Sequence, residues 1–152
     1  MATRTLRAGI IAGLVGGAID SIFLVVVSVL SGQSLAASVI GMYQFAAAGA
    51  IGKSLAFSSP AFAWLGLPVH FAVSIAWALG FVYLAQRRRQ LIERPLISGV
   101  AFGFVVWIMM QIVLIGAGLF QNPTPSGLAI ALLAHCVFFG IPVAYTNARL
   151  SR

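Results

Sequence analysis

Four long apolar stretches dominate the sequence and restrict its fold more than any other feature. They cover residues 8–30, 64–86, 96–120 and 127–145. A helix needs about 20 predominantly apolar residues to cross the hydrocarbon core of a bilayer. Because lipid offers no hydrogen-bond partner to an open backbone, stretches of this kind are expected to be helices. The sequence therefore predicts a single all-α domain over residues 1–152, with four transmembrane helices.

The composition agrees with a membrane protein and argues against a soluble one. Hydrophobic residues make up 61% of the chain and charged residues only 7%, whereas about a quarter of the residues in soluble domains are charged. A formal net charge of +7 would suggest nucleic-acid binding in a soluble protein. Here the basic residues lie at the ends of apolar stretches, as they do in membrane proteins. We therefore expect the lipid bilayer as a partner and no nucleic acid.

The basic residues also predict the orientation of the chain. If four spans begin with the N-terminus inside, eight arginines face the cytoplasm and Lys53 alone faces outward. The eight are Arg4, Arg7, Arg87, Arg88, Arg89, Arg94, Arg149 and Arg152. Since Lys and Arg accumulate on the cytoplasmic side, we expect both termini in the cytoplasm and a multi-pass protein of the inner (cytoplasmic) membrane. Arg87, Arg88, Arg89 and Arg94 either set this topology or bind anionic lipid head groups.

Residues 34–57 form a further apolar segment, which is rich in alanine and glycine and carries Lys53. A fifth span would place the first two arginines outside and reduce the asymmetry to six basic residues against three. The segment is nevertheless too apolar to remain a solvated loop. We therefore predict a helix or a broken hairpin within residues 34–60 that lies at the outer interface and packs on the bundle.

Glycines recur every fourth residue in the first and third stretches. They are Gly9, Gly13 and Gly17, and Gly99 and Gly103. Residues four apart share one face of a helix, and faces of small residues allow membrane helices to approach closely. These glycines are therefore predicted to pack helices together, either inside the bundle or against another subunit.

The two halves of the chain show a faint similarity. Three residues of the first stretch match three of the third at a constant offset of 86: Ile11, Gly13 and Gly17 with Ile97, Gly99 and Gly103. The second and fourth stretches both close with a tyrosine followed four residues later by an arginine: Tyr83 with Arg87, and Tyr145 with Arg149. The pattern is either chance or the trace of two similar helical hairpins in parallel orientation.

Away from its ends, each of the four stretches carries one strongly polar side chain: Asp20, His70, Gln111 and His135. An ionisable group at this depth costs a few kcal/mol unless it faces the interior and finds a partner. Counted at about 1.5 Å per residue from the ends of the helices, all four lie between the midplane and the outer surface. They are predicted to form one intramembrane layer, which is either a structural hydrogen-bond network or a pathway for protons or a ligand.

Enzyme chemistry is not indicated, so we expect no catalytic residues, no metal and no cofactor. The single cysteine, Cys136, excludes an internal disulfide, and the glycine pattern lies inside an apolar helix rather than in a phosphate loop. His70, Asp20 and His135 lack the tight ligand spacing of a zinc site. The one cofactor alternative is haem b, held between His70 and His135.

Several apolar motifs resemble small uncharacterised bacterial inner-membrane proteins of the YagU-like kind. The motifs are residues 66–71 (GLPVHF), 95–103 (PLISGVAFG), 122–125 (NPTP) and 134–142 (AHCVFFGIP). The resemblance covers roughly residues 64–149. It implies a multi-span membrane fold and carries no catalytic role.

These features lead to three functional hypotheses. We expect first a non-catalytic accessory, structural or assembly subunit, packed with other membrane subunits or with itself, because the chain of 152 residues has almost no mass outside the predicted spans. The alternative is a small oligomeric transporter or proton-conducting channel that uses Asp20, His70, Gln111 and His135. The third is a haem b-binding electron carrier.

Overall fold

The structure is a computed structural model, and it describes residues 2–116, 118–119 and 124–151. All secondary structure in these residues is helical. In chain order the elements are α1 (Ala2–Leu30), α2 (Leu35–Ile51), α3 (Lys53–Ala56), the 3₁₀ turn η1 (Pro60–Phe62), α4 (Ala63–Arg87), α5 (Gln90–Glu93), α6 (Pro95–Gly116), α7 (Pro125–Leu133), the π-helix η2 (Ala134–Gly140) and α8 (Ile141–Leu150).

The structure contains four helical stretches that are long and apolar enough to cross a membrane. They are Thr3–Leu30, Pro60–Arg87, Pro95–Gly116 and Pro125–Leu150. The prediction of an all-α protein with four candidate spans is therefore confirmed. The third span was expected to reach residue 120, but its described part ends at Gly116, and residues 117 and 120 lie outside the described residues. The fourth runs without a break through α7, η2 and α8.

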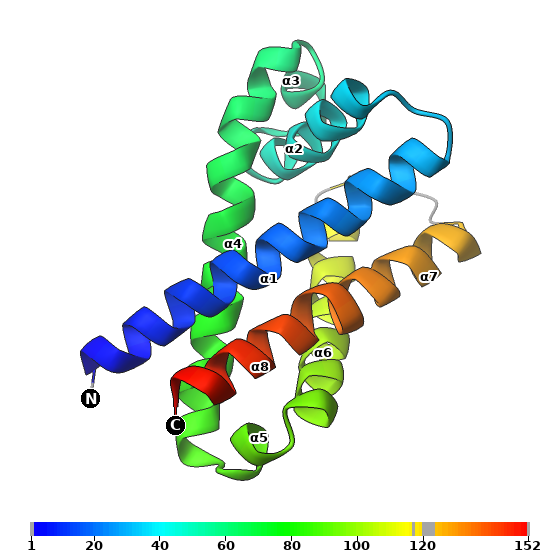
Figure 1. Ribbon diagram of the computed structural model, residues 1–152. Helices are drawn as coiled ribbons and strands as arrows, with labels where there is room; N and C mark the ends of the chain where they lie inside the picture. The colour runs from blue at the N-terminus through cyan, green and yellow to red at the C-terminus, as the bar shows by residue number, and fades with distance from the viewer. Residues whose placement is uncertain (1, 117, 120–123, 152) are drawn as a thin grey trace.

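Both termini lie at one end of the molecule, together with α5 (Figure 1). We call this the terminal end; α2 and α3 lie at the opposite end, the loop end. A hydrogen bond ties the two termini together, because the Arg4 guanidinium donates to the carbonyl oxygen of Leu150 at 3.0 Å. The seven described arginines precede, follow or end the spans at the terminal end, whereas Lys53 lies in α3.

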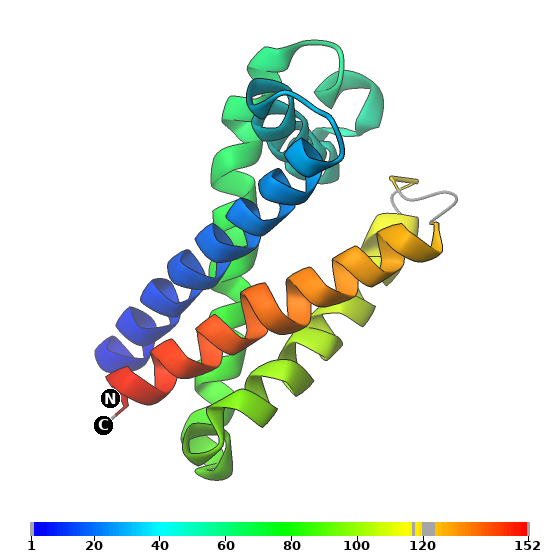
Figure 2. The same cartoon turned by 45° about the vertical axis from the view of Figure 1, so that its right-hand side comes forward.

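The four spans form two hairpins that meet along one seam. In the first hairpin α1 packs on α4, and in the second α6 packs on η2 and α8; α1 also packs on η2 and α8 and so joins the two. Figure 2 shows that the hairpins converge at the terminal end and spread apart toward the loop end. A core cluster that draws on all four spans holds them together: Ala12, Ala78, Phe81, Ala85, Val106, Phe139, Val143 and Ala144.

Glycines mark the closest approach in each hairpin. A Cβ atom on Gly13 would lie 2.5 Å from the Cα of Ile75, and one on Gly99 would lie 2.7 Å from the Cα of Ile141. Cβ atoms on Gly9 and Gly17 would meet α4, and one on Gly103 would meet η2, in the same way. The five predicted packing glycines therefore act inside the bundle, as one of the two interpretations expected, and they do not leave a small-residue face for another subunit.

The segment after the first span is a helix packed against α4, as predicted. Ser34 caps α2, since its hydroxyl accepts a hydrogen bond from the Ala37 N–H at 3.2 Å. Gln44 links α2 to the chain that follows it. Its side-chain amide donates to the carbonyl oxygens of Ala56 at 3.1 Å and Ser59 at 3.0 Å. At 17 residues α2 is shorter than the roughly 20 residues that a span needs. Its place at a membrane interface stays a prediction.

The fourth span contains the seven-residue π-helix η2 directly before Pro142. Proline has no N–H, and its ring displaces the carbonyl group four residues earlier, which is that of Phe138. The wider π turns of residues 134–140 accommodate this displaced carbonyl group. Short π segments of this kind occur often at functional sites, and this one carries His135.

Candidate functional site

Asp20 is a buried carboxyl group inside the first span. Its side chain is only 6% exposed, and Oδ1 has no hydrogen-bond partner among the described residues. An unpaired polar oxygen in an apolar interior is costly, and more so in a membrane span. The sequence predicted the buried position correctly. It also predicted a hydrogen-bond partner for Asp20, and Oδ1 has none among the described residues.

His70, on α4, contacts α1 at the residue next to Asp20. Its Nε2 atom lies 3.0 Å from Ser21 Oγ and 3.1 Å from the Gly17 carbonyl oxygen. The Ser21 hydroxyl donates its only proton to that same carbonyl oxygen at 2.8 Å. His70 Nε2 therefore carries the proton in this arrangement, because both atoms that face it can then only accept.

Ser21 is the functional neighbour that the sequence did not single out. It is buried at 5% exposure and links α1 to His70. One signal pointed to it: Gly17 and Ser21 are four residues apart and continue the small face of α1. Serine in a membrane helix commonly bonds to its own helix, however, so this signal alone did not distinguish a link to α4.

His135 lies in the π-helix η2 on the other hairpin. Its Nδ1 atom is 2.7 Å from the Ala131 carbonyl oxygen and donates to it, since a carbonyl oxygen only accepts. In the neutral ring Nε2 is then an acceptor with a free lone pair.

The fourth residue of the predicted layer, Gln111, lies on α6. This helix packs chiefly on η2 and α8 and contacts α4 through the rings of Phe102 and Phe81, whose centres are 4.8 Å apart. Gln111 is only partly buried as a residue. Its Oε1 atom is buried without a hydrogen-bond partner among the described residues, as is Nε1 of Trp107 one turn earlier. No hydrogen bond joins any two of Asp20, His70, Gln111 and His135 in the described part of the chain. The expected network is therefore replaced by a Ser21–His70 pair and separate polar groups.

The histidine nitrogens bear on the haem b alternative. A haem bridged by two histidines needs a free imidazole nitrogen from each, and Nε2 of His70 is engaged by Ser21 and Gly17, which leaves Nδ1. Among the described residues no group of three or more His, Cys, Asp or Glu side chains could hold a metal ion.

The predicted head-group arginines lie at the terminal end of the molecule. Arg87 donates to the Tyr83 hydroxyl, and its guanidinium lies 4.5 Å from the centre of that ring. Arg89 forms an ion pair with Glu93 at 2.9 Å, and both side chains are well exposed. Arg88 and Arg94 are also exposed. Exposed arginines at this end are compatible with both predicted roles, which are setting the topology and binding anionic lipid head groups.

Four apolar spans around buried polar groups define a polytopic helical membrane protein. The chain belongs to a family of unknown function (DUF6789), whose model matches residues 3–152. No curated protein and no solved structure matches the chain. The family match does not connect the chain with the YagU-like proteins, so that resemblance stays a prediction.

Proposed function

We propose that this protein is a non-catalytic subunit of a larger assembly in the bacterial inner membrane, with both termini in the cytoplasm. The proposal rests on how little of α6 is covered by the rest of the chain. Only 17% of the residues in its most apolar stretch are buried inside the chain, against 28–33% in the other three spans. This least covered span also carries Gln111, whose amide oxygen has no described partner.

The physical argument rests on the cost of a polar group in lipid. An exposed apolar helix is satisfied by acyl chains, but an amide in the middle of it is not. Asn and Gln side chains in membrane helices hydrogen-bond across helix–helix interfaces, and such bonds contribute about 1 kcal/mol. A partner helix against the loop-end half of α6 would cover Ile112 and Val113, which are 60% and 54% exposed, and could bond the amide nitrogen of Gln111, since the amide oxygen is already buried.

Photo-crosslinking tests this assignment. A photoreactive residue at Ile112 of α6 is compared with one at Ile22 of α1, which is equally exposed (60% and 63%). We expect Ile112 to crosslink to one protein that also copurifies in fixed stoichiometry, and Ile22 to crosslink to lipid alone. Gln111→Leu should weaken copurification without loss of helicity. Equal crosslinking from both positions, or a fully monomeric protein in native membranes, would contradict the proposal.

The second candidate is a proton-conducting protein, and Asp20 is the observation that favours it. A buried carboxyl group without a partner opposes folding, so its presence suggests a role beyond structure. Ser21 follows Asp20 in the chain, and His70 and His135 lie on α4 and η2, which both pack on α1, so these are the groups that would relay a proton. Proton flux into proteoliposomes is the measurement. Flux in the unmutated protein that disappears in Asp20→Asn supports this candidate, because an amide does not titrate; no flux in the unmutated protein contradicts it.

A further inference from the structure

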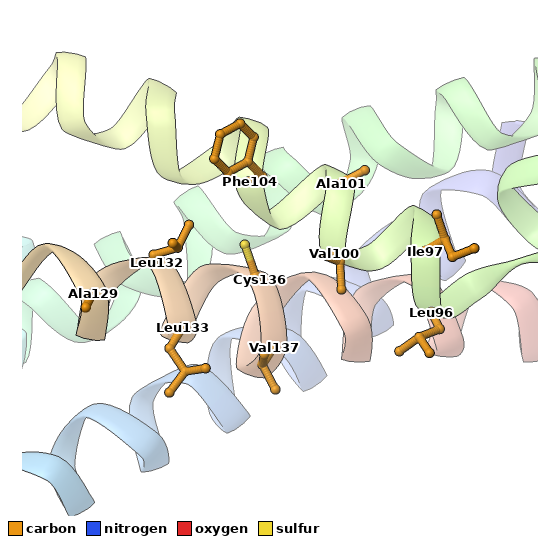
Figure 3. Close-up of a pocket in the computed structure, with 10 residues that line it drawn as sticks. All are labelled: Leu96, Ile97, Val100, Ala101, Phe104, Ala129, Leu132, Leu133, Cys136 and Val137. Atoms are coloured by element: carbon orange, nitrogen blue, oxygen red, sulfur yellow. The ribbon is translucent and has the colours of Figure 1, made fainter.

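A wholly apolar groove runs along the outside of the second hairpin, away from the polar site. It has a volume of about 750 Å³, and Figure 3 shows its two walls, one on α6 and one on α7 and η2. The residues that line it are Leu96, Ile97, Val100, Ala101, Phe104, Ala129, Leu132, Leu133, Cys136 and Val137. Most of them are exposed or half-exposed, so the groove is open to whatever surrounds the spans.

The length of the groove fits one leaflet of a bilayer. On α6 it extends from Leu96 to Phe104, a distance of about 12 Å at a rise of about 1.5 Å per residue. One leaflet contributes about 15 Å of hydrocarbon to the core. The groove also begins at the first turn of α6, where the chain enters its third candidate span. It therefore starts near the expected head-group level and reaches toward the middle of the membrane.

A positive charge without a counter-ion among the described residues lies at the start of the groove. Arg94 directly precedes α6, is exposed, and lies two residues before the groove residue Leu96. The chain has only two acidic residues: Glu93 is paired with Arg89, and Asp20 is buried inside α1. The free N–H groups of the first turn of α6 add partial positive charge at the same place. This end of the groove is therefore complementary to an anion.

We propose that the groove binds one acyl chain of an anionic phospholipid, whose phosphate group lies at Arg94. An apolar chain with an anion at one end is the chemistry that this combination of groove and charge recognises. A second copy of the protein fits less well: side by side in one membrane, it would bring its own arginines to the same level. Charge repulsion between the two sets would oppose that contact.

Native mass spectrometry of the purified protein with added lipid tests the head-group half of the proposal. The probes are dioleoylphosphatidylglycerol and dioleoylphosphatidylcholine, which differ in charge and not in acyl chains. Arg94→Gln is compared with Arg7→Gln, an exposed arginine on α1 at the same end. We expect Arg94→Gln to reduce the preference for phosphatidylglycerol about fivefold, as one arginine near a phosphate contributes about 1 kcal/mol. An equal effect of both variants would overturn the assignment of Arg94.

Filling the groove tests the acyl-chain half. Ala101→Phe and Ala129→Phe add a ring to opposite walls, and both alanines are exposed, so the rings need no space in the core. Ala76→Phe makes the same change on an exposed position of α4 outside the groove. We expect either groove variant to bind both lipids at least fivefold more weakly, and the control to bind normally.

Two results would overturn the proposal. The first is unchanged lipid binding in a groove variant that keeps its helicity; if one variant does not fold, the other serves. The second is a change from dimer to monomer in the groove variants with unchanged lipid binding, which would make the groove an interface between two copies. Crosslinking at Ile112 is independent of both results, so failure here leaves the proposed assembly role intact.

Discussion

At the scale of single residues, the most informative contact is the one that His70 makes with Ser21 and Gly17. It joins α4 to α1 through atoms that can be removed one at a time. The Ser21 hydroxyl contributes in two ways, since it also donates to its own helix at Gly17. Ser31 makes only the second kind of bond, to Val27 at 2.8 Å, and is therefore a natural reference.

Ser21→Ala should destabilise the protein more than Ser31→Ala does. The difference isolates the contact with His70, and we expect about 0.5–1.5 kcal/mol, the usual net value of one hydrogen bond. Thermal or denaturant unfolding in detergent measures it. In a background with His70→Phe the difference between the two serine variants should vanish. A difference that persists in that background would show that Ser21 acts through something other than His70.

Asp20 permits a second prediction at this scale. Because no described residue pairs with its carboxyl group, replacing it by leucine removes an unsatisfied polar group without leaving a partner unpaired. Asp20→Leu should therefore be as stable as the unmutated protein or more stable, and Asp20→Asn should be equally stable. Unfolding measurements on both variants provide the check. A loss of 1 kcal/mol or more in Asp20→Leu alone would indicate a hydrogen-bond partner from outside the described residues, such as another subunit or bound water.

At the scale of helices, the two hairpins use the same kind of contact. The glycines matched at an offset of 86 are the ones that approach the partner helix in each hairpin, Gly13 at Ile75 and Gly99 at Ile141. These two contacts relate the partner helices by an offset of 66, whereas the contacts of Gly17 with Ser74 and of Gly103 with Cys136 give an offset of 62. Tyr83 and Tyr145 are also 62 apart, so the tyrosine match is in register with the second pair of glycine contacts.

Gly103 lies in close backbone contact with η2 and Gly80 does not, so alanine substitutions at the two positions should differ in their effect on stability. A Cβ atom on Gly103 would lie 2.6 Å from the Cα of Cys136, whereas around Gly80, inside α4, nothing lies within 4 Å. Gly103→Ala should cost about 1–3 kcal/mol, because a backbone has to move. Gly80→Ala should be neutral or stabilise by up to about 1 kcal/mol, because alanine favours the helix. Unfolding in detergent compares the two, and equal effects would contradict the close packing of α6 on η2.

At the scale of the whole molecule, the sequence predicted the elements better than their arrangement. Length and apolarity of the stretches were enough to predict four spans, because the thickness of a bilayer restricts helix length. The same reasoning placed one polar residue per span at a similar depth, but depth does not determine which helices touch. Gln111 and Asp20 share no hydrogen bond among the described residues, since α6 packs chiefly on η2 and α8, and this packing depends on pairings between helix faces that no single stretch encodes.

The orientation of the whole molecule is the remaining prediction. The described arginines are at the terminal end and Lys53 is at the loop end, so the terminal end should face the cytoplasm. Cys136 is the chain's single cysteine, and its replacement by alanine gives a background for cysteine labelling. Ser54→Cys in α3 and Gln90→Cys in α5 then place one exposed thiol at each end. In intact bacterial cells a membrane-impermeant maleimide that passes the outer membrane should label Ser54→Cys and leave Gln90→Cys unlabelled. After the inner membrane is permeabilised both should react, and labelling of Gln90→Cys in intact cells would reverse the proposed orientation.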